Sequence, residues 1–306
     1  MSAIEIVCVG SAKCDTLARV GHQPGEDERM LTDRIVTAAG GNANTAAAAA
    51  ARQGVSVALC TVLGRDPPGD FLLSEMQRFG VDTRFVLRPA GLATPQSINV
   101  ACTDTATRFI ITVASPVIPW EGVVQARPIW AHFDAEGFRA AREAIATRRI
   151  GCLVSVDAGI TLDTRDLTGI DLYAPTRERI VAEFGGGLED AMHAAHAAGA
   201  RDVVVTLGPE GAAVLTGGVV TYHPGFRVDV VSTLGAGDVF HGALVAALVR
   251  GLDLQAAVRC ANVSAALACR ALDGQSAIPS ICELTEHLDH HARATAASRA
   301  SKRIDR

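Results

Sequence analysis

The chain's most informative stretch is Val228-Asp229-Val230-Val231-Ser232-Thr233-Leu234-Gly235-Ala236-Gly237-Asp238-Val239-Phe240-His241-Gly242-Ala243-Leu244. Its first residues alternate and are β-branched, which predicts a strand. Two glycines separated by one alanine follow, and residues this small let the backbone bend tightly and turn successive N–H groups toward one point. The apolar residues after Asp238 predict a helix whose positive end faces the same point.

This geometry predicts an anion hole formed by the backbone N–H groups of Gly235, Ala236 and Gly237. An anion hole of this kind suits the negative charge that builds up on a phosphoryl group during transfer. Asp238 lies in the first turn of the predicted helix, where a substrate hydroxyl can approach, and we interpret it as a general base. The alternative is that Asp238 only complements the helix dipole.

The composition is that of a globular enzyme. The 306 residues suffice for one large α/β domain with a small appendage, or for two domains. The formal net charge of −5 argues against a general nucleic-acid or membrane-surface binder. The first ten residues contain Glu5 and no basic segment, so we expect no signal peptide, and no apolar run reaches the ~20 residues that span a bilayer.

The eight cysteines form no Cys-x-x-Cys pair and no cluster with histidine. Cys8, Cys60 and Cys152 lie in apolar, strand-like runs. We therefore expect reduced core cysteines in a cytoplasmic protein, with neither disulfides nor zinc ligands.

Strand and helix patterns alternate along much of the chain. Apolar runs predict buried strands at residues 4–9, 55–63, 152–156, 172–175 and 203–208. Amphipathic patterns predict helices at 71–79, 136–149, 178–183 and 253–270. The segment 40–46 is expected to open a further helix that runs to Arg52, whose alanines allow it to pack tightly. From Glu283 the polar chain is expected to form a helix that frays into a solvated tail. This order is typical of an α/β fold with a doubly wound sheet.

Two separated motifs resemble the signatures of the ribokinase-like (PfkB) family of sugar kinases. Residues 230–244 resemble the second signature, and Gly40-Gly41-Asn42-Ala43-Asn44-Thr45-Ala46 resembles the first, Gly-Gly-x-x-x-Asn. The resemblance covers roughly residues 4–282. It implies one kinase domain over residues 1–306, with a mostly parallel sheet between helices and a small β-sheet lid formed by about 13–38 and 94–115.

The resemblance also implies the reaction: ATP-dependent, magnesium-assisted phosphorylation of a hydroxymethyl group on a sugar or sugar derivative, with Asp238 as the base. In the first signature, ungapped alignment places the family's asparagine at Thr45, with Asn44 one residue early, so that role stays open between the two. Asp15, expected in the loop after the first strand, is a candidate for binding sugar hydroxyls or a turn residue. The expected substrate-binding residues are Asp15, Gly40, Gly41, Asn44, Thr45 and Thr112.

On the nucleotide side, the resemblance points to the end of strand 203–208 and to the loops around the second signature. The expected cofactor-binding residues are Thr206, Gly208, Gly211, Thr233, Asn262 and Gly274. For residues 206–211 the alternative is a plain strand-turn-strand hairpin. Glu178 stands where many relatives have the glutamate of Asn-x-x-Glu near the metal, and the alternative is an exposed helix charge. Relatives that use potassium have aspartate where this chain has Ser232, so a potassium requirement is left open.

Within the family, the second signature and Thr45 are closest to the sulfofructose kinases. Those enzymes hold a sulfonate with an arginine and an asparagine, and the matching positions around Asp134 and at Thr112 offer neither group. We therefore expect a neutral or differently charged sugar. The resemblance further implies a homodimer through the lid sheet.

Two other functions stay open. A nucleoside kinase of the same fold would need an aromatic clamp for the base, and Phe109 is the clearest aromatic residue in the lid. A non-catalytic sugar- or nucleotide-binding regulator would account for the altered Asn-x-x-Glu. A dinucleotide-dependent oxidoreductase is excluded, because no Gly-x-Gly-x-x-Gly follows the first strand.

Overall fold

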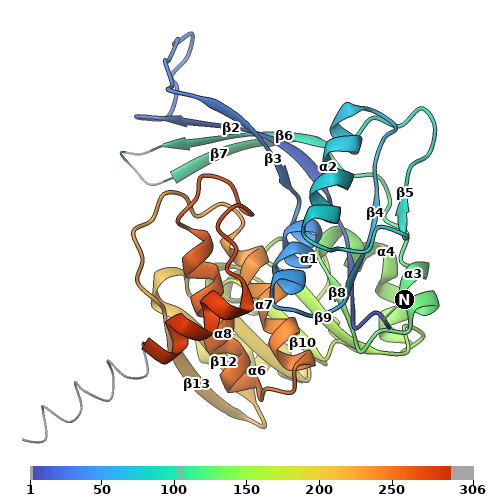
Figure 1. The fold of residues 1–306 in the computed structure, drawn as a ribbon. Helices are drawn as coiled ribbons and strands as arrows, with labels where there is room; N and C mark the ends of the chain where they lie inside the picture. Colours follow the sequence, from blue (N-terminus) through green and yellow to red (C-terminus); the bar gives the residue numbers. More distant parts are fainter. Residues whose placement is uncertain (1–2, 103, 105–106, 291–306) are drawn as a thin grey trace, which may run out of the picture.

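The computed structural model describes residues 3–102, 104 and 107–290, and within this part of the chain nine strands form one large sheet (Figure 1). Their order is β13-β12-β11-β10-β9-β8-β1-β4-β5. The strands are β1 (Ile6–Val9), β4 (Val57–Val62), β5 (Val86–Leu87), β8 (Trp130–Phe133), β9 (Leu153–Ala158), β10 (Leu172–Pro175), β11 (Asp202–Thr206), β12 (Gly211–Thr216) and β13 (Val219–Pro224). Only the β11-β12 and β12-β13 pairs are antiparallel, which confirms the predicted mostly parallel sheet.

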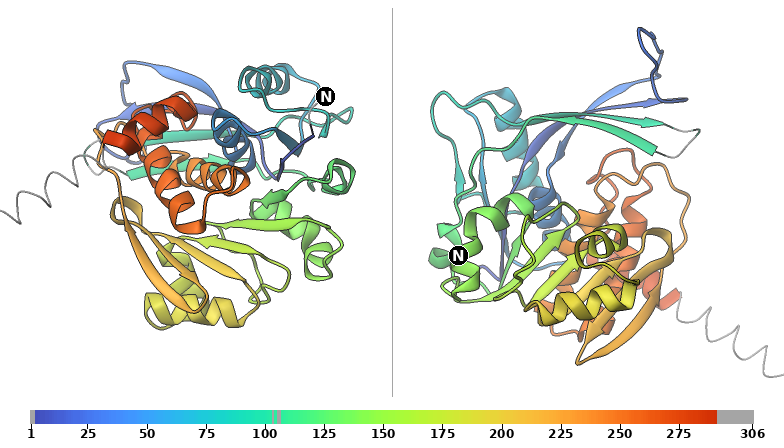
Figure 2. Two further views of the ribbon diagram at one scale, coloured as in Figure 1. Left: turned by 60° about the horizontal axis from the view of Figure 1, so that its bottom comes forward. Right: turned by 180° about the vertical axis from the view of Figure 1, so that it is seen from behind.

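Helices cover both faces of this sheet, as Figure 2 shows from two further sides. Side chains alternate along each strand, so in β1 Ile6 and Cys8 pack into one core while Val7 and Val9 pack into the other. The first core is closed by α1 (Asn42–Arg52), α2 (Pro67–Arg78), α7 (Ala236–Val249) and α8 (Leu254–Ala268). The second is closed by α3 (Glu121–Ala126), α4 (Ala135–Ala146), α5 (Arg177–Phe184) and α6 (Leu188–Ala197).

A separate sheet of four strands, within the described residues, confirms the small sheet that was expected from about 13–38 and 94–115. Its order is β3-β2-β6-β7, and its strands are β2 (Lys13–Val20), β3 (Ile35–Gly40), β6 (Gln96–Cys102) and β7 (Thr107–Thr112). The register places Asp15 opposite Ser97 and Ser97 opposite Thr112, so these three share one face. Ile98 and Ile111 are paired on the other face and are exposed.

The small sheet extends over the loop that precedes α7 (Figure 1). Leu17 and Ala38 of the small sheet pack with Leu272, and Leu234 lies against the same group. Because Leu234 directly precedes Gly235, this apolar contact holds the small sheet beside the N-terminus of α7.

Close packing of α1 against α7 brings the N-termini of both helices together. Every residue of α1 from Ala46 to Ala50 is a buried alanine. Opposite them, a Cβ on Gly242 would overlap the carbonyl of Ala46, so only glycine allows the two backbones to approach this closely. The small side chains on both helices thus allow this tight packing.

Several predicted boundaries were wrong. The strand expected from Val228 is a loop, in which the amides of Val231 and Ser232 donate to the Cys269 carbonyl. β13 already occupies the sheet edge, so the β-branched Val230 and Val231 stay on the surface. α2 begins at Pro67 instead of Phe71, because the Asp66 carboxylate accepts from the Gly69 amide and caps it.

The other predicted elements are present with shifts of a few residues at their ends. The predicted C-terminal helix is described for residues 281–290, and the predicted tail lies outside the described residues. All eight cysteines are free. Cys8 and Cys60 are buried as expected, whereas Cys152 is half-buried and precedes β9. Within the described ranges, no helix has the length and apolar character needed to cross a bilayer.

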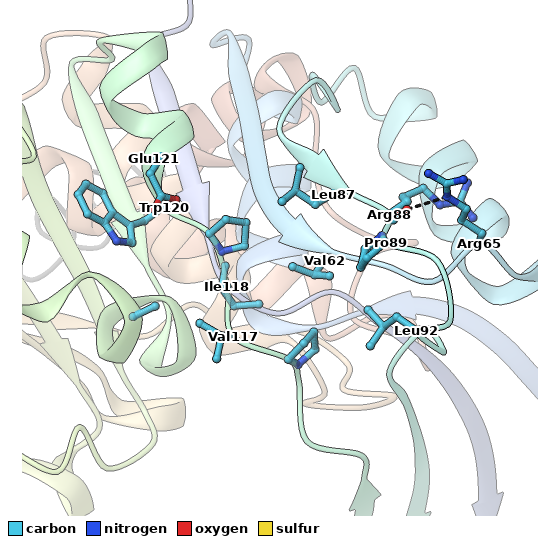
Figure 3. Close-up of a pocket in the computed structure, with 13 residues that line it drawn as sticks. Val62, Arg65, Leu87, Arg88, Pro89, Leu92, Val117, Ile118, Trp120 and Glu121 are labelled. Atoms are coloured by element: carbon cyan, nitrogen blue, oxygen red, sulfur yellow. Dashed lines mark hydrogen bonds between the residues drawn. The ribbon is translucent and has the colours of Figure 1, made fainter.

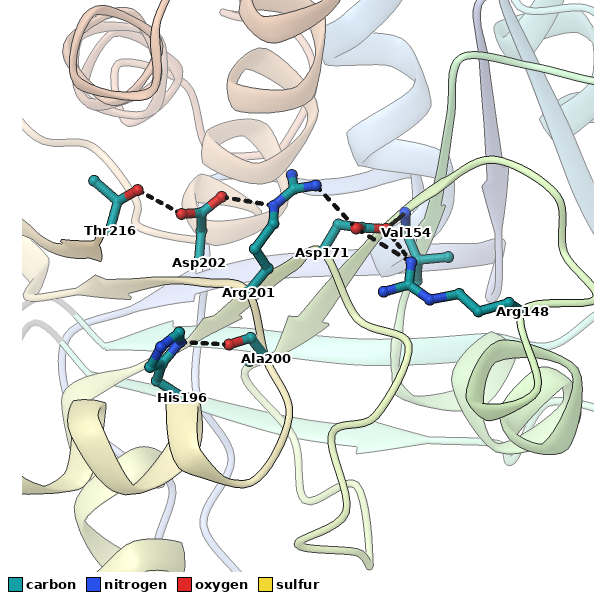
Figure 4. A network of polar contacts seen from close by, with 8 residues as sticks. All are labelled: Arg148, Val154, Asp171, His196, Ala200, Arg201, Asp202 and Thr216. Atoms are coloured by element: carbon teal, nitrogen blue, oxygen red, sulfur yellow. Dashed lines mark hydrogen bonds and ion pairs between the residues drawn. The ribbon is translucent and has the colours of Figure 1, made fainter. Parts of the chain in front are cut away.

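An aspartate ties three strands together at the edge where they begin (Figure 4). Asp171 precedes β10 and is only 2% exposed. Its carboxylate accepts from the Val154 amide at 2.9 Å, from Arg148 Nη1 at 3.1 Å and from Arg201 Nη1 at 3.0 Å. It therefore joins β9, β10 and the start of β11.

We expect Asp171→Ala to lower the free energy of unfolding by about 2–3 kcal/mol, because the buried Val154 amide loses its acceptor, Arg148 loses its anionic partner and Arg201 keeps only Asp202. Urea denaturation measures the loss. The matched control is Glu143→Ala, which breaks an exposed pair with Arg149 and should cost under about 1 kcal/mol. Equal losses in the two variants would contradict this interpretation of Asp171.

Candidate active site

The N-terminus of α7 forms the predicted tight turn. Gly235 has φ of 73° and caps the helix with no side-chain hydrogen bond. A Cβ on Gly235 would lie 2.7 Å from the Cα of Gly274, so this turn and the loop after α8 touch. The Ala236 amide donates to the Thr233 carbonyl at 3.3 Å. The amides of Gly237 and Asp238 are first-turn groups without partners inside the helix, available to an anion at this end.

Asp238 stands in this first turn and is partly accessible. Its Oδ1 accepts a hydrogen bond of 2.8 Å from the side-chain amide of Asn42, the first residue of α1. The backbone amide of Asn42 donates to Ser11 Oγ at 3.1 Å, and Ser11 Oγ donates to Asp134 Oδ2 at 2.9 Å. This chain of polar contacts fixes Asp238 relative to the ends of β1 and β8.

The Asp238 carboxyl has a strongly raised pKa of about 7. Loss of hydration is the main cause and the negative charge of Asp157 is the second, with a smaller effect of Asp134 in the same direction. The His241 charge and the Asn42 hydrogen bond oppose these effects. A carboxyl with a pKa near neutrality can both take up and release a proton, as general-base catalysis requires.

Asp134 is buried and accepts hydrogen bonds from both the amide and the hydroxyl of Ser11. Burial raises its pKa to about 6, although the amides of Gly137 and Ser11 donate to it and oppose the rise. Its Oδ1 caps α4 by accepting from the amides of Glu136 and Gly137 at 3.0 and 2.9 Å. Both of its oxygens are therefore engaged in holding the ends of β1 and α4 in place.

A second buried cluster lies beside Asp238. His241 Nδ1 is 3.2 Å from Asp157 Oδ2, and the His132 ring lies 5.9 Å from the His241 ring. Burial alone would lower the pKa of His241, but the Asp157 charge, then Asp238 and the Ala174 carbonyl, raise it overall. Burial would likewise raise the pKa of Asp157, but His241 outweighs it and the pKa falls. Burial and the His241 charge lower the pKa of His132 to about 3, so His132 is neutral.

Asp15 lies in β2, not in a loop as predicted, because the chain enters the small sheet directly after the turn that follows β1. Its Oδ1 accepts from Ser97 Oγ at 2.5 Å, and Asn99 Nδ2 donates to Ser97 Oγ at 2.7 Å. Burial raises the pKa of Asp15, and the Ser97 bond and Lys13 oppose the rise. A Cβ on Gly40 would overlap the Asp15 carboxylate, which explains the glycine there.

The other first-signature residues are structural as well as close to this site. Gly41 has φ of 90°, and a Cβ there would lie 2.6 Å from the Ala12 Cα. Asn44 and Thr45 are both buried. The Asn44 amide donates to the Gly40 carbonyl, and Thr45 Oγ1 accepts from Gln275 Nε2. Neither is the asparagine that reaches Asp238.

Thr112 ends β7 on the same face as Asp15. Its Oγ1 accepts from Lys13 Nζ at 3.1 Å, and Lys13 also lies 3.7 Å from Glu136 Oε1. The Lys13 ammonium near Thr112 is therefore already paired with the Glu136 carboxylate.

The predicted nucleotide-side residues fall into two groups. Thr233 and Gly274 adjoin the Gly235 turn. Thr206 ends β11, and a short 3₁₀ turn that begins at Gly208 and ends before Gly211 leads into antiparallel β12, so this segment is a strand-turn-strand hairpin whose part in nucleotide binding stays a prediction. A Cβ on Gly211 would overlap the His223 carbonyl. Asn262 is buried in α8 and donates to the carbonyls of His223 and Pro224 at 3.3 Å.

Glu178 is exposed in the first turn of α5, which follows β10 at the carboxyl edge of the sheet. The neighbouring Arg177 forms a two-bond pair with Glu210 at 3.0 Å. No group of three or more His, Cys, Asp or Glu side chains arranged to hold a metal occurs in the described part of the chain.

Sequence reasoning missed Asn42, Ser11, Arg108 and the Asp157–His241 pair. Arg108 of β7 donates to Thr233 Oγ1 at 3.0 Å, linking the small sheet to the turn before α7. Asn42 directly follows the glycine pair, and His241 follows Asp238 by one helical turn. Spacing from the two motifs was thus an available signal for Asn42 and His241, whereas Ser11, Arg108 and Asp157 lie outside both motifs.

A surface pocket of about 750 Å³ is lined by a different set of residues (Figure 3). It is lined mainly by apolar side chains near the ends of β4 and β5 and in the segment 116–121. Neither Asp15 nor any residue of the α7 turn lines it. It is therefore not the site assembled around Asp238.

Comparison with known proteins is consistent with this geometry. The model of the pfkB family of carbohydrate kinases matches residues 3–122 and 140–281. The deoxyribokinase of Salmonella typhi is 25% identical over 302 residues, covering 93% of this chain and 99% of the relative. The aminoimidazole riboside kinase of Salmonella typhimurium is 27% identical over 286 residues, covering 84% and 90%. The structure of Arabidopsis thaliana ribokinase complexed with ribose and ATP is 23% identical, with a TM-score of 0.80 and coverage of 93% and 98%.

We expect Asn42→Ala to raise the pKa of Asp238 above its value of about 7, because the Asn42 amide stabilises the ionised carboxylate. A ¹³C NMR titration of the aspartate carboxyl carbons measures this directly. Asn44→Ala is the matched control, since the Asn44 amide donates to Gly40. An unchanged Asp238 titration in Asn42→Ala would contradict the assigned contact.

Proposed function

The chain belongs to the pfkB family of carbohydrate kinases, and we propose that it transfers the γ-phosphoryl group of ATP to a hydroxymethyl group of a sugar or sugar derivative. The observation that carries the proposal is the meeting of Asp238 with the glycine turn at one helix N-terminus. In this proposal Asp238 is the general base, and the amides of Gly235, Ala236 and Gly237 form the anion hole, for which the Ala236 amide gives up its 3.3 Å bond to the Thr233 carbonyl.

The proposed reaction is a direct displacement. As the acceptor oxygen attacks the γ-phosphorus, its proton passes to the Asp238 carboxylate, and the bond from the γ-phosphorus to the bridging oxygen of ADP breaks. The amides at the α7 N-terminus stabilise the charge on the phosphoryl oxygens. ADP leaves with the bonding electron pair, and Asp238 later releases the proton to water.

The nucleotide would lie along the carboxyl edge of the large sheet, between the Thr206–Gly211 turn and the loop around Gly274. We propose Thr206, Gly208, Gly211, Thr233, Asn262 and Gly274 as residues that shape this place, Asn262 by holding the backbone after β13. Magnesium, when bound, neutralises charge on the ATP phosphates. The exposed Glu178 is the side chain proposed near it. Ser232 Oγ accepts from the Leu234 amide, and the proposal leaves a potassium requirement open.

The acceptor would lie between the small sheet and the α7 turn. Asp15 presents a carboxylate there, and Gly40, Gly41 and Thr112 border it, with Asn44 and Thr45 supporting the backbone. We propose a sugar other than sulfofructose. Asp134 is committed to Ser11 and α4, and Lys13 near Thr112 is balanced by Glu136, so neither of these two positions offers a free cation to a sulfonate.

The nucleoside-kinase alternative has less support in the small sheet. Phe109 pairs with Val100, whereas Asn99 pairs with Ile110, so Phe109 faces away from Asp15. It is 45% exposed on the outer face. No aromatic clamp is therefore supplied by Phe109, and the relatives that act on sugars are the better guide to the acceptor.

We also propose that residues 1–306 work as one kinase domain in which the small sheet is a lid. The Arg108–Thr233 contact and the Leu17–Leu234 cluster would hold the lid over the α7 turn. A closed lid excludes water, so transfer to the sugar outcompetes hydrolysis of ATP. The eight free cysteines support a reducing compartment, and we propose the cytoplasm.

The outer face of the lid is proposed as a homodimer interface, because it presents exposed apolar side chains on neighbouring strands. These are Ile35, Ile98, Phe109 and Ile111. We expect the protein to be a dimer by light scattering at micromolar concentration, and Ile98→Glu to make it a monomer. Val219→Glu, on the exposed apolar face of β13, is the control. A monomeric wild-type protein would rule this interface out.

Asp238→Asn should lower kcat by ~10² or more, because the amide cannot accept the proton. ADP release is measured across ribose, deoxyribose, fructose, sulfofructose and a set of nucleosides. Calorimetric binding of a non-hydrolysable ATP analogue should be preserved. Asp229→Asn, in the exposed loop before α7, is the control and should retain activity. Wild-type activity in Asp238→Asn, or no transfer by the wild-type protein to any acceptor, would contradict the proposal.

A further inference from the structure

A buried ion pair stands directly behind the candidate base. Asp157 and His241 lie 3.2 Å apart, and each is only 5% exposed. Within the described residues, neither ring nitrogen of His241 makes a well-aligned hydrogen bond, so charge is what ties this ring to Asp157. Burying two charges costs free energy that such a pair seldom returns in full. Stability alone therefore explains the pair poorly.

The pair is placed to act on Asp238. His241 follows Asp238 by three residues on α7, and side chains with this spacing are neighbours on one helix face. Asp157 lies near the carboxyl end of β9, where its carboxylate meets His241 of α7. A cation and an anion thus adjoin the carboxyl that is proposed to accept the proton.

The titratable groups around this cluster come from three elements. They are His132 on β8 with Asp134 after its end, Asp157 on β9, and Asp238 and His241 on α7. His132 is neutral and its Nδ1 lies 3.2 Å from Ser155 Oγ. Asp134 is engaged by Ser11 and the α4 amides. The charge that adjoins Asp238 is therefore set chiefly by the balance between Asp157 and His241.

We propose, building on the general-base role of Asp238, that His241 is a positioning residue: as an imidazolium held by Asp157, it balances the Asp157 charge and keeps Asp238 ionised and able to accept a proton. The directions of the pKa shifts agree with this geometry. The Asp157 charge raises the pKa of Asp238, and the His241 charge lowers it. Without the imidazolium, two buried carboxylates would share one site and titrate as a coupled pair.

The test is the pH dependence of kcat/KM with the best acceptor from the sugar panel. The wild-type acid limb should lie near pH 7, since Asp238 must be ionised to act as a base. His241→Asn leaves Asp157 unbalanced, so the acid limb should move upward by about one pH unit, with about tenfold lower kcat/KM at pH 6 and recovery at high pH. His241→Asn with Asp157→Asn removes both charges and should return the limb toward the wild-type position.

Two further measurements separate this inference from the proposed function. A ¹³C titration of Asp238 in the same variants reads its charge without any turnover, so it stands even if no acceptor is found. His132→Asn is the control, because it alters an equally buried but neutral ring and should leave the Asp238 titration in place. A uniform loss of activity in His241→Asn with no shift of the limb or of the titration would show a purely structural role.

The wild-type protein provides a check that needs no variant to fold. Ring ¹⁵N spectra of His241 should show both nitrogens protonated at pH 7.5, as expected for an imidazolium held by Asp157. A neutral His241 ring at that pH would overturn the inference, whatever the variants show.

Discussion

The contact between α1 and α7 is the constraint on which the rest of the site depends. Because residue 242 is glycine and faces the Ala46 carbonyl, no side chain at this point holds α1 and α7 apart. As a result the first residue of α1, Asn42, reaches Asp238 in the first turn of α7. One backbone approach therefore sets the position of the proposed base, and the polar chain through Ser11 and Asp134 ties it to the sheet.

The second feature of the site is a balance of buried charge. Three aspartates, at 134, 157 and 238, lie at the carboxyl edge of the large sheet or against it. A different group stabilises each buried carboxylate. The backbone amides of Ser11 and of α4 donate to Asp134, the His241 ring pairs with Asp157, and the Asn42 side-chain amide donates to Asp238. Only Asp238 is left partly accessible, with a pKa near neutrality, which suits a group that exchanges protons with a substrate.

Much of the fold could be predicted from the sequence, because strong local patterns agree with tertiary structure. Residues 46–50 and the apolar run at 55–63 are buried in the structure, so the helix and the strand predicted there are present. The strand predicted from Val228 was wrong because alternating β-branched residues indicate only a preference for extended backbone. They do not indicate whether a sheet edge is free to pair with the segment. Asp15 was expected in a loop because the register of the small sheet depends on partners about 80 residues away.

The site was predictable where chemistry is contiguous in sequence and not where it is assembled in space. The glycine turn and Asp238 form one motif, so their local geometry was foreseen. Asn42, Asp157 and Arg108 come from distant segments, and only the helix packing and sheet order bring them to Asp238 or its turn.

The central claim is that Asp238 and the α7 amides converge on a transferring phosphoryl group. A crystal structure with ADP, aluminium fluoride and a sugar acceptor tests it most directly. The account predicts the fluoride on the amides of residues 235–237, with the acceptor hydroxyl within hydrogen-bond distance of Asp238, and a fluoride bound elsewhere would contradict it.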